Sequence, residues 1–234
     1  MVQYKNIFID LDDTIWDFTA NSHVSLAIMY KELGIAEIYP DYNLFSTTYY
    51  NKNSELWALY HHGKIDKDFL IIERYAYLLR EIGYNDPENK LAGRMNKFYL
   101  DTLAQQTRLV PHAVELLEYL SGKGYNLFIL SNGFIEVQQR KLQSAGIAQY
   151  FKRIVLSDEI GINKPDRRLF DYALEVTNSV AENTLMLGDN YDADILGAMN
   201  AGWGQIYFDR NNKGITAEVP QHIVHSLAEV HLVL

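Results

Sequence analysis

Four acidic side chains follow short apolar runs of the sequence. Asp10, Asp12 and Asp13 come directly behind the run "NIFI", and Asp189 ends the run "NTLMLGD". Carboxylates placed this close together repel one another unless a cation lies between them. Magnesium prefers carboxylate and water oxygens and is commonly shared between protein carboxylates and a substrate phosphate. These acids therefore indicate a site for a hard divalent cation.

Apolar, β-favouring runs alternate with helical patterns over much of the chain. Such alternation is typical of a parallel, doubly wound α/β sheet. Asp10, Ser131, Ser157 and Asp189 would then end different strands at one edge, where open α/β sheets bind ligands. We expect strands at residues 6–9, 125–131, 153–157, 183–189 and 204–209, and helices at 112–122, 133–146, 164–176 and 192–202.

Residues 19–105 lack this alternation and have the pattern of consecutive helices. One of these helices is expected to have Asp66 as its N-cap and to stop at Gly83. We therefore divide the chain into a Rossmann-like α/β core of residues 1–18 and 106–234 and an inserted all-helical domain of residues 19–105. An insert directly after the first strand is expected to cover the ligand site as a lid.

The composition disfavours several classes of protein. The 234-residue chain has 48% hydrophobic and 22% charged residues, which is ordinary for a globular protein. It contains no cysteine, so disulfides, thiolate metal sites and thiol catalysis are excluded. The formal net charge of -9 argues against nucleic-acid polymers as partners. We see neither an apolar run that could span a membrane nor a secretion signal, so we expect a cytoplasmic protein.

Four short motifs occur in the order of a known family. They are DLDDT (Asp10 to Thr14), LSNG (Leu130 to Gly133), NKPD (Asn163 to Asp166) and GDNYDAD (Gly188 to Asp194). Together they resemble the four motifs of the haloacid dehalogenase superfamily, and the resemblance covers nearly the whole chain. Each motif is weak alone, but four in order, each at an expected element boundary, are jointly specific. The helical insert is similar to that superfamily's first type of cap.

The resemblance implies a role for three acids. Asp10 is expected to attack phosphorus and to form an aspartyl-phosphate that water then hydrolyses. Asp12 is expected to protonate the leaving alkoxide and later to take a proton from the attacking water. Asp10, Asp189 and the backbone carbonyl of Asp12 are expected to hold Mg²⁺, the cofactor that the resemblance implies.

The other motifs are expected to bind the phosphoryl group. Ser131 would donate a hydrogen bond to a phosphoryl oxygen, helped by backbone N–H groups near Asn132 and Gly133 at the start of a helix. Lys164 would add positive charge from a second helix start, because Pro165 suits a first helical position.

Several neighbouring residues receive supporting roles. Asp194 is expected to orient a metal-bound water or Lys164, although an acid that complements a helix dipole is nearly as good an explanation. Asp13 and Asp192 are placed outside the metal site, and Thr14 is expected to support the loop.

These observations predict a Mg²⁺-dependent phosphatase that acts on a small phosphomonoester, as a monomer or a homodimer. The stretches DLDDTIWDF, ELWALYHHGKID and GDNYDAD are most similar to pyrimidine nucleoside 5'-monophosphatases of the superfamily. A sugar-phosphate phosphatase or phosphomutase stays open, because either would keep the same residues. A haloacid dehalogenase needs neither Asp12 nor a metal, and a non-catalytic phosphate-binding module would have degenerate motifs, so both are disfavoured.

Overall fold

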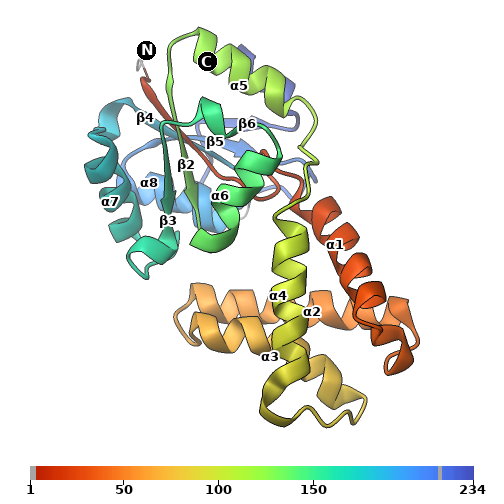
Figure 1. Cartoon of the computed structure of the whole chain (residues 1–234). Coiled ribbons are helices and arrows are strands. Elements are labelled where there is room, and N and C mark those ends of the chain that lie inside the picture. The colour runs from red at the N-terminus through yellow and green to blue at the C-terminus, as the bar shows by residue number, and fades with distance from the viewer. Residues whose placement is uncertain (1–3, 216–217) are drawn as a thin grey trace. The chain divides into compact units, whose positions relative to one another are not determined.

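A computed structural model describes residues 4–215 and 218–234 of the chain (Figure 1). The chain forms two compact units, one of Met1–Thr19 with Thr107–Leu234 and the other of Ala20–Gln106. Residues 1–3 and 216–217, which fall in the predicted core, lie outside the described residues.

The first unit contains a six-stranded sheet in the order β3-β2-β1-β4-β5-β6, in which every neighbouring pair is parallel. The predicted doubly wound parallel sheet is therefore confirmed. The sequence does not predict β6, because three residues are too few to show an alternation or an apolar run. The strands are β1 Asn6–Ile9, β2 Asn126–Ser131, β3 Arg153–Leu156, β4 Thr184–Gly188, β5 Gly204–Phe208 and β6 His222–Val224.

Two helices of this unit differ from the predicted ranges. The pattern at 192–202 divides into a π-helical turn, Tyr191–Leu196, and a short α-helix. The helix expected from Lys164 starts later, because the Asp166 side chain accepts a hydrogen bond from the Arg168 N–H and caps it there. The helices of the unit are α5 Ala113–Gly122, α6 Ile135–Ser144, α7 Arg167–Thr177 and α8 Gly197–Ala201.

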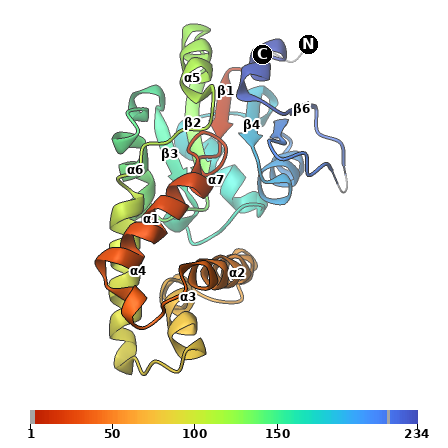
Figure 2. The ribbon, with the colours of Figure 1, turned by 90° about the vertical axis from the view of Figure 1, so that its right-hand side faces the viewer.

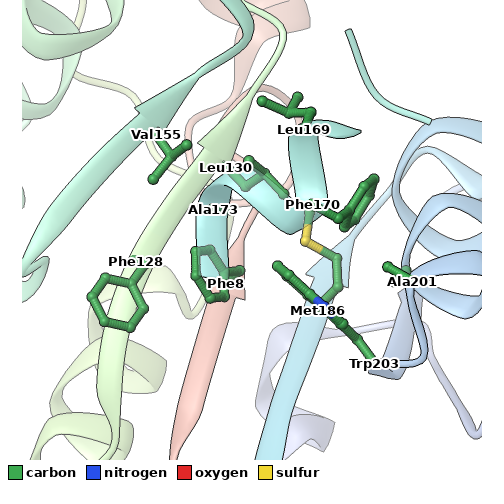
Figure 3. Close-up of a cluster of buried hydrophobic side chains, with 11 residues drawn as sticks. Phe8, Phe128, Leu130, Val155, Leu169, Phe170, Ala173, Met186, Ala201 and Trp203 are labelled. Atoms are coloured by element: carbon green, nitrogen blue, oxygen red, sulfur yellow. The ribbon is translucent and has the colours of Figure 1, made fainter. Parts of the chain in front are cut away.

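Large apolar side chains fix the central strands of the sheet (Figure 3). Phe8 on β1 packs against Phe128 and Trp203, with ring centroids 4.8 and 4.7 Å away. Phe170 on α7 packs edge-on against Trp203, and residues of α8 complete this cluster. Burial of such a side chain stabilises the fold by about 1.5–3 kcal/mol. All four residues of β1 are buried, so the strand that leads into Asp10 is firmly held.

The second unit, all of which is described, consists of helices and their connections and has no strand, as the sequence predicts. Helices α2 and α3 lie side by side within it (Figures 1 and 2). The Asp66 side chain accepts a hydrogen bond from the Phe69 N–H at 2.8 Å and caps α3, and Gly83 follows the helix with a φ of 69°, so both predicted boundaries are confirmed. The helices are α1 Phe18–Glu32, whose first two residues belong to the first unit, α2 Tyr42–His61, α3 Lys67–Glu81 and α4 Lys90–Leu103.

None of the helices in the described part of the chain has the length and hydropathy that a bilayer span requires.

Candidate active site at the carboxyl edge of the sheet

Three carboxylates meet where β1 and β4 end. Asp10 follows β1, Asp189 follows β4, and Asp194 lies in the π-helical turn. One oxygen of each lies within 4.8 Å of the others. The two strands are neighbours in the sheet, with Ile9 paired to Leu187, and the Asp10 N–H donates a hydrogen bond to the Leu187 carbonyl at 2.9 Å. The sheet register therefore brings together acids that are far apart in the sequence.

A buried lysine lies between two of these acids. The Lys164 ammonium contacts Asp10 Oδ1 at 2.6 Å, Asp194 Oδ1 at 2.6 Å and the Leu130 carbonyl oxygen at 2.8 Å. These contacts use all three of its N–H protons. Burial alone lowers the pKa of Lys164, but the charges of Asp10 and Asp194 outweigh burial and hold this pKa above its usual value. Lys164 is therefore a constant positive charge beside Asp10.

The loop before α7 presents this lysine. The Asn132 side chain accepts a hydrogen bond from the Lys164 N–H at 2.8 Å and donates one to the Lys164 carbonyl at 3.1 Å. The prediction that Pro165 occupies a first helical position is wrong, because α7 starts at Arg167 after its cap Asp166. Pairing with Asn132, and not a helix start, fixes the backbone of Lys164.

At this edge of the sheet the three carboxylates outnumber the single ammonium group, that of Lys164. When they are ionised, three carboxylates and one ammonium leave an excess of negative charge. Burial raises the pKa of Asp189 to about 7, with further contributions from Asp194 and Asp13. Burial also raises the pKa of Asp10, and the opposing effect of Lys164 does not cancel this rise. A divalent cation would offset the excess charge and favour the ionised acids.

The hydrogen bonds that each acid already accepts show which of the three could also bind a metal ion. Asp194 Oδ1 contacts Lys164, and Asp194 Oδ2 accepts a hydrogen bond from the Asn190 N–H at 3.0 Å. Asp10 and Asp189 each keep one carboxylate oxygen that accepts no hydrogen bond from the described residues. Their free oxygens are hard donors of the kind that magnesium prefers. The residues present therefore fit a divalent cation held by Asp10 and Asp189, with Asp194 orienting Lys164.

Asp12 is held by two side chains of α6. Neither of them belongs to the four motifs. The Lys141 ammonium lies 2.7 and 3.0 Å from the two carboxylate oxygens of Asp12, and Gln138 Nε2 donates to Asp12 Oδ2 at 2.9 Å. Both α6 residues are buried with the apolar face of that helix. A lysine and a glutamine within an apolar helical face are a usable sequence signal, because such side chains are rarely buried without a partner.

Ser131 is placed to donate a hydrogen bond. It ends β2, and its hydroxyl oxygen accepts hydrogen bonds from the Gly133 N–H at 3.1 Å and from Gln138 Nε2 at 2.7 Å. These contacts occupy both lone pairs, which leaves the hydroxyl hydrogen for another acceptor such as a phosphoryl oxygen. The Gly133 N–H, in contrast to its predicted phosphate contact, points to Ser131. Gly133 also leaves room for Gln138, because an added Cβ would lie 2.1 Å from Gln138 Nε2.

The remaining acids and Thr14 shape the loops. The Thr14 hydroxyl accepts a hydrogen bond from the Asp189 N–H at 3.0 Å and donates one to Asp189 Oδ1 at 3.3 Å, which ties the loop after β1 to the end of β4. Asp13 has a φ of 61° and accepts hydrogen bonds from the Thr19 N–H and hydroxyl, both at 2.9 Å. Asp192 is exposed. Asp13 and Asp192 thus lie outside the group of three carboxylates.

Known proteins match the chain over most of its length. The family model described as haloacid dehalogenase-like hydrolase matches residues 4–202. The pyrimidine 5'-nucleotidase PynA of Streptococcus pneumoniae is 32% identical over 97% of this chain and 93% of its own length. The pyrimidine 5'-nucleotidase YjjG of Escherichia coli is 32% identical over 97% and 96%. The crystal structure of the HAD-hydrolase YfnB from Bacillus subtilis bound to magnesium has a TM-score of 0.88 and 28% identity, over 99% and 98% of the two chains.

Proposed function

The chain belongs to the haloacid dehalogenase-like hydrolases and is a phosphatase of that family, and on this premise we propose that it hydrolyses pyrimidine nucleoside 5'-monophosphates. We further propose that the reaction needs Mg²⁺ and passes through an aspartyl-phosphate. One observation carries the chemistry: a carboxylate at the end of the central strand, Asp10, lies 2.6 Å from a buried lysine and within 4.8 Å of two further carboxylates.

In the proposed first step, Asp10 is the nucleophile. One of its oxygens attacks the phosphorus, the bond between phosphorus and the 5'-oxygen of the nucleoside breaks, and Asp12 gives a proton to that oxygen. Lys164 keeps its charge beside Asp10 and so reduces the repulsion between the nucleophile and the anionic phosphate. Bound Mg²⁺ would supply further neutralisation of the phosphate charge.

In the proposed second step, water hydrolyses the aspartyl-phosphate. The water oxygen attacks phosphorus, Asp12 takes a proton from the water, and Asp10 leaves as a carboxylate. Throughout both steps the Ser131 hydroxyl would donate a hydrogen bond to the phosphoryl group. Its two accepted hydrogen bonds support this role, since they hold the oxygen and leave the hydrogen free.

The substrate proposal is supported by two relatives. Both pyrimidine 5'-nucleotidases are 32% identical to this chain and are matched over more than nine-tenths of their length. Coverage of 97% of this chain includes the helical unit as well as the α/β unit, whereas the four motifs all lie in the α/β unit.

The test is phosphate release from a panel of nucleoside monophosphates, sugar phosphates and short-chain phosphoesters, with and without Mg²⁺. We expect the highest kcat/KM for pyrimidine nucleotides and no turnover in excess EDTA until Mg²⁺ is restored. Asp10→Asn should lower kcat by at least about 10³-fold, because no nucleophile remains. Asp192→Asn, which changes an exposed acid of the neighbouring turn, is the matched control and should behave as wild type.

Each component of the proposal can fail separately. Preference for sugar phosphates would overturn the substrate, near-normal turnover by a folded Asp10→Asn protein would overturn the nucleophile, and full activity in excess chelator would remove the metal.

A further inference from the structure

The proposed reaction assigns no role to two buried polar side chains of α6. Gln138 is 0% exposed and Lys141 is 3% exposed. A lysine is almost never buried this completely unless it is paired. Among the described residues the only carboxylate within ion-pair distance of Lys141 is Asp12, and its ammonium also lies 4.5 Å from the Trp16 ring centroid and 5.3 Å from that of Phe18. The lysine is therefore held in one place by an acid and two aromatic rings.

Asp12 receives three donor contacts on its two carboxylate oxygens. Lys141 contacts both oxygens, at 2.7 and 3.0 Å, and Gln138 adds a hydrogen bond to Oδ2 at 2.9 Å. Donors on both oxygens fix the plane of the carboxylate. The Asp12 side chain is nevertheless 29% exposed. One side of the fixed carboxylate thus remains open to water.

Gln138 connects Asp12 to Ser131. Its Nε2 atom has two hydrogens, and the two acceptors are Asp12 Oδ2 at 2.9 Å and the Ser131 hydroxyl oxygen at 2.7 Å. Gln138 Oε1 is buried and accepts no hydrogen bond from the described residues. A half-turn of the amide would place this acceptor against the Asp12 carboxylate, so the amide orientation is determined by its two donor contacts. One amide therefore sets the spacing between the proton acceptor and the proposed phosphate ligand.

Gly133 leaves room for the Gln138 amide that connects Asp12 to Ser131. A Cβ at Gly133 would lie 2.1 Å from Nε2 and 2.4 Å from Cδ of Gln138, so any other residue would displace the amide. The glycine therefore lets the Gln138 amide lie against the backbone of residue 133.

We infer that Lys141 and Gln138 are positioning residues for the second step, which hold the Asp12 carboxylate where it takes a proton from the water that attacks the aspartyl-phosphate. This inference rests on the proposed function. In the step itself the water oxygen bonds to phosphorus, the phosphorus–oxygen bond to Asp10 breaks with its electron pair left on Asp10, and Asp12 gains the water proton. The rival explanation is an ion pair that only stabilises the packing of α6.

The two explanations differ in steady-state kinetics with p-nitrophenyl phosphate. In a two-step reaction, kcat/KM reports events up to formation of the aspartyl-phosphate, whereas kcat includes its hydrolysis. Loss of a positioning residue for hydrolysis should therefore lower kcat and KM together. We expect Lys141→Met to lower kcat by about 10- to 100-fold, a part of what proton transfer contributes, with kcat/KM changed by less than about threefold, because nitrophenolate leaves without a proton from Asp12. Gln138→Leu should lower kcat by a similar factor and kcat/KM by a smaller one, because it also releases the Ser131 hydroxyl.

The accumulated intermediate gives an independent readout. Both variants should release a burst of nitrophenolate and retain labelled phosphate on the protein after a rapid acid quench. In an Asp12→Asn background, Lys141→Met should change kcat by less than about threefold, because the lysine acts through Asp12. Lys123→Met, on a surface lysine over Tyr119, and Gln139→Leu, on an exposed neighbour in α6, are matched controls and should keep wild-type kinetics.

Two results would overturn the inference. One is an equal fall of kcat and kcat/KM without a burst, which a role in the first step or in packing predicts, and the other is an unchanged kcat in both variants. Gln138→Leu keeps the test open if Lys141→Met does not fold. Absence of wild-type turnover with p-nitrophenyl phosphate and Mg²⁺ would instead overturn the phosphatase mechanism, and the inference with it.

Discussion

At the scale of a single residue, the environment of the site changes the pKa of Asp189. Burial, together with the charges of Asp194 and Asp13, raises its pKa to about 7. An aspartate in an unfolded chain has a pKa of about 3.9. Between these values the folded, metal-free protein keeps a proton on Asp189 that the unfolded chain has already lost. The carboxylate is therefore a site where metal and proton compete.

The stability of the metal-free protein should depend on this proton. Because the folded state binds it more tightly, the contribution of Asp189 to the free energy of unfolding falls as pH rises from about 4 to about 7 and stays low above that. In chelator at about pH 8, Asp189→Asn should melt at a higher temperature than wild type, and the difference should shrink toward about pH 4. Thermal unfolding followed by circular dichroism measures both, with Asp192→Asn as control. Equal melting temperatures at every pH would contradict the raised pKa.

At the scale of the element, the turn after β4 depends on a close contact. An added Cβ on Gly188, the last residue of β4, would lie 2.2 Å from Asp194 Oδ2. Asp194 is 0% exposed and is held by Lys164 and by the Asn190 N–H, so it has no open space to move into. The glycine lets the π-helical turn fold back against the strand end. The position of Lys164 therefore depends on a residue without a side chain.

Gly188→Ala should disturb this arrangement. The extra methyl group displaces Asp194 from Lys164, and we expect a loss of stability of about 1–3 kcal/mol together with a fall in kcat/KM of at least about tenfold. Gly122→Ala is the matched control, because a Cβ there meets nothing within 4 Å. Gly122 is the last residue of α5, and its replacement should leave stability and kinetics close to wild type. Urea unfolding and phosphate release test both variants, and a Gly188→Ala protein with wild-type stability and kinetics would refute the argument.

At the scale of the whole molecule, the metal ligands exist as a set only in the folded chain. Asp10 follows β1 near the N-terminus, and Asp189 follows β4, which pairs with β1 in the sheet. An unfolded chain would leave these carboxylates far apart and fully hydrated. A cation that they share binds the native state and should stabilise it by mass action.

Mg²⁺ should therefore raise the melting temperature of the whole protein. At a concentration about 100 times the dissociation constant, binding contributes about 2.7 kcal/mol, which for a chain of this size corresponds to about 5–10 °C. Differential scanning calorimetry across a Mg²⁺ titration measures the shift. Asp189→Asn should lose most of it and Asp192→Asn should keep it. A shift of equal size in both variants would place the cation elsewhere.

Local pattern predicts much of this architecture. The run at 6–9 is β1, the Asp66 cap and the Gly83 stop enclose α3, and the parallel sheet follows from the alternation of strands and helices. The sequence predicts too early a start for α7, because Pro165 suits a first helical position, whereas the Asp166 side chain caps the helix one residue later. The strand β6 is too short for a periodic signal.

The sequence by itself determined the strand ends, their acids and the order of the motifs, because apolar runs, caps and turn residues act over a few neighbouring positions. Only the tertiary structure decided which side chains contact one another across the sheet edge. Lys141 contacts Asp12, from which it is 129 residues distant in the sequence, and Lys164 contacts Asp10 at a sequence separation of 154 residues. Such partners depend on how α6 and the loop before α7 pack against β1 and β2. No short-range pattern encodes that packing, since it depends on all the elements being in place at once.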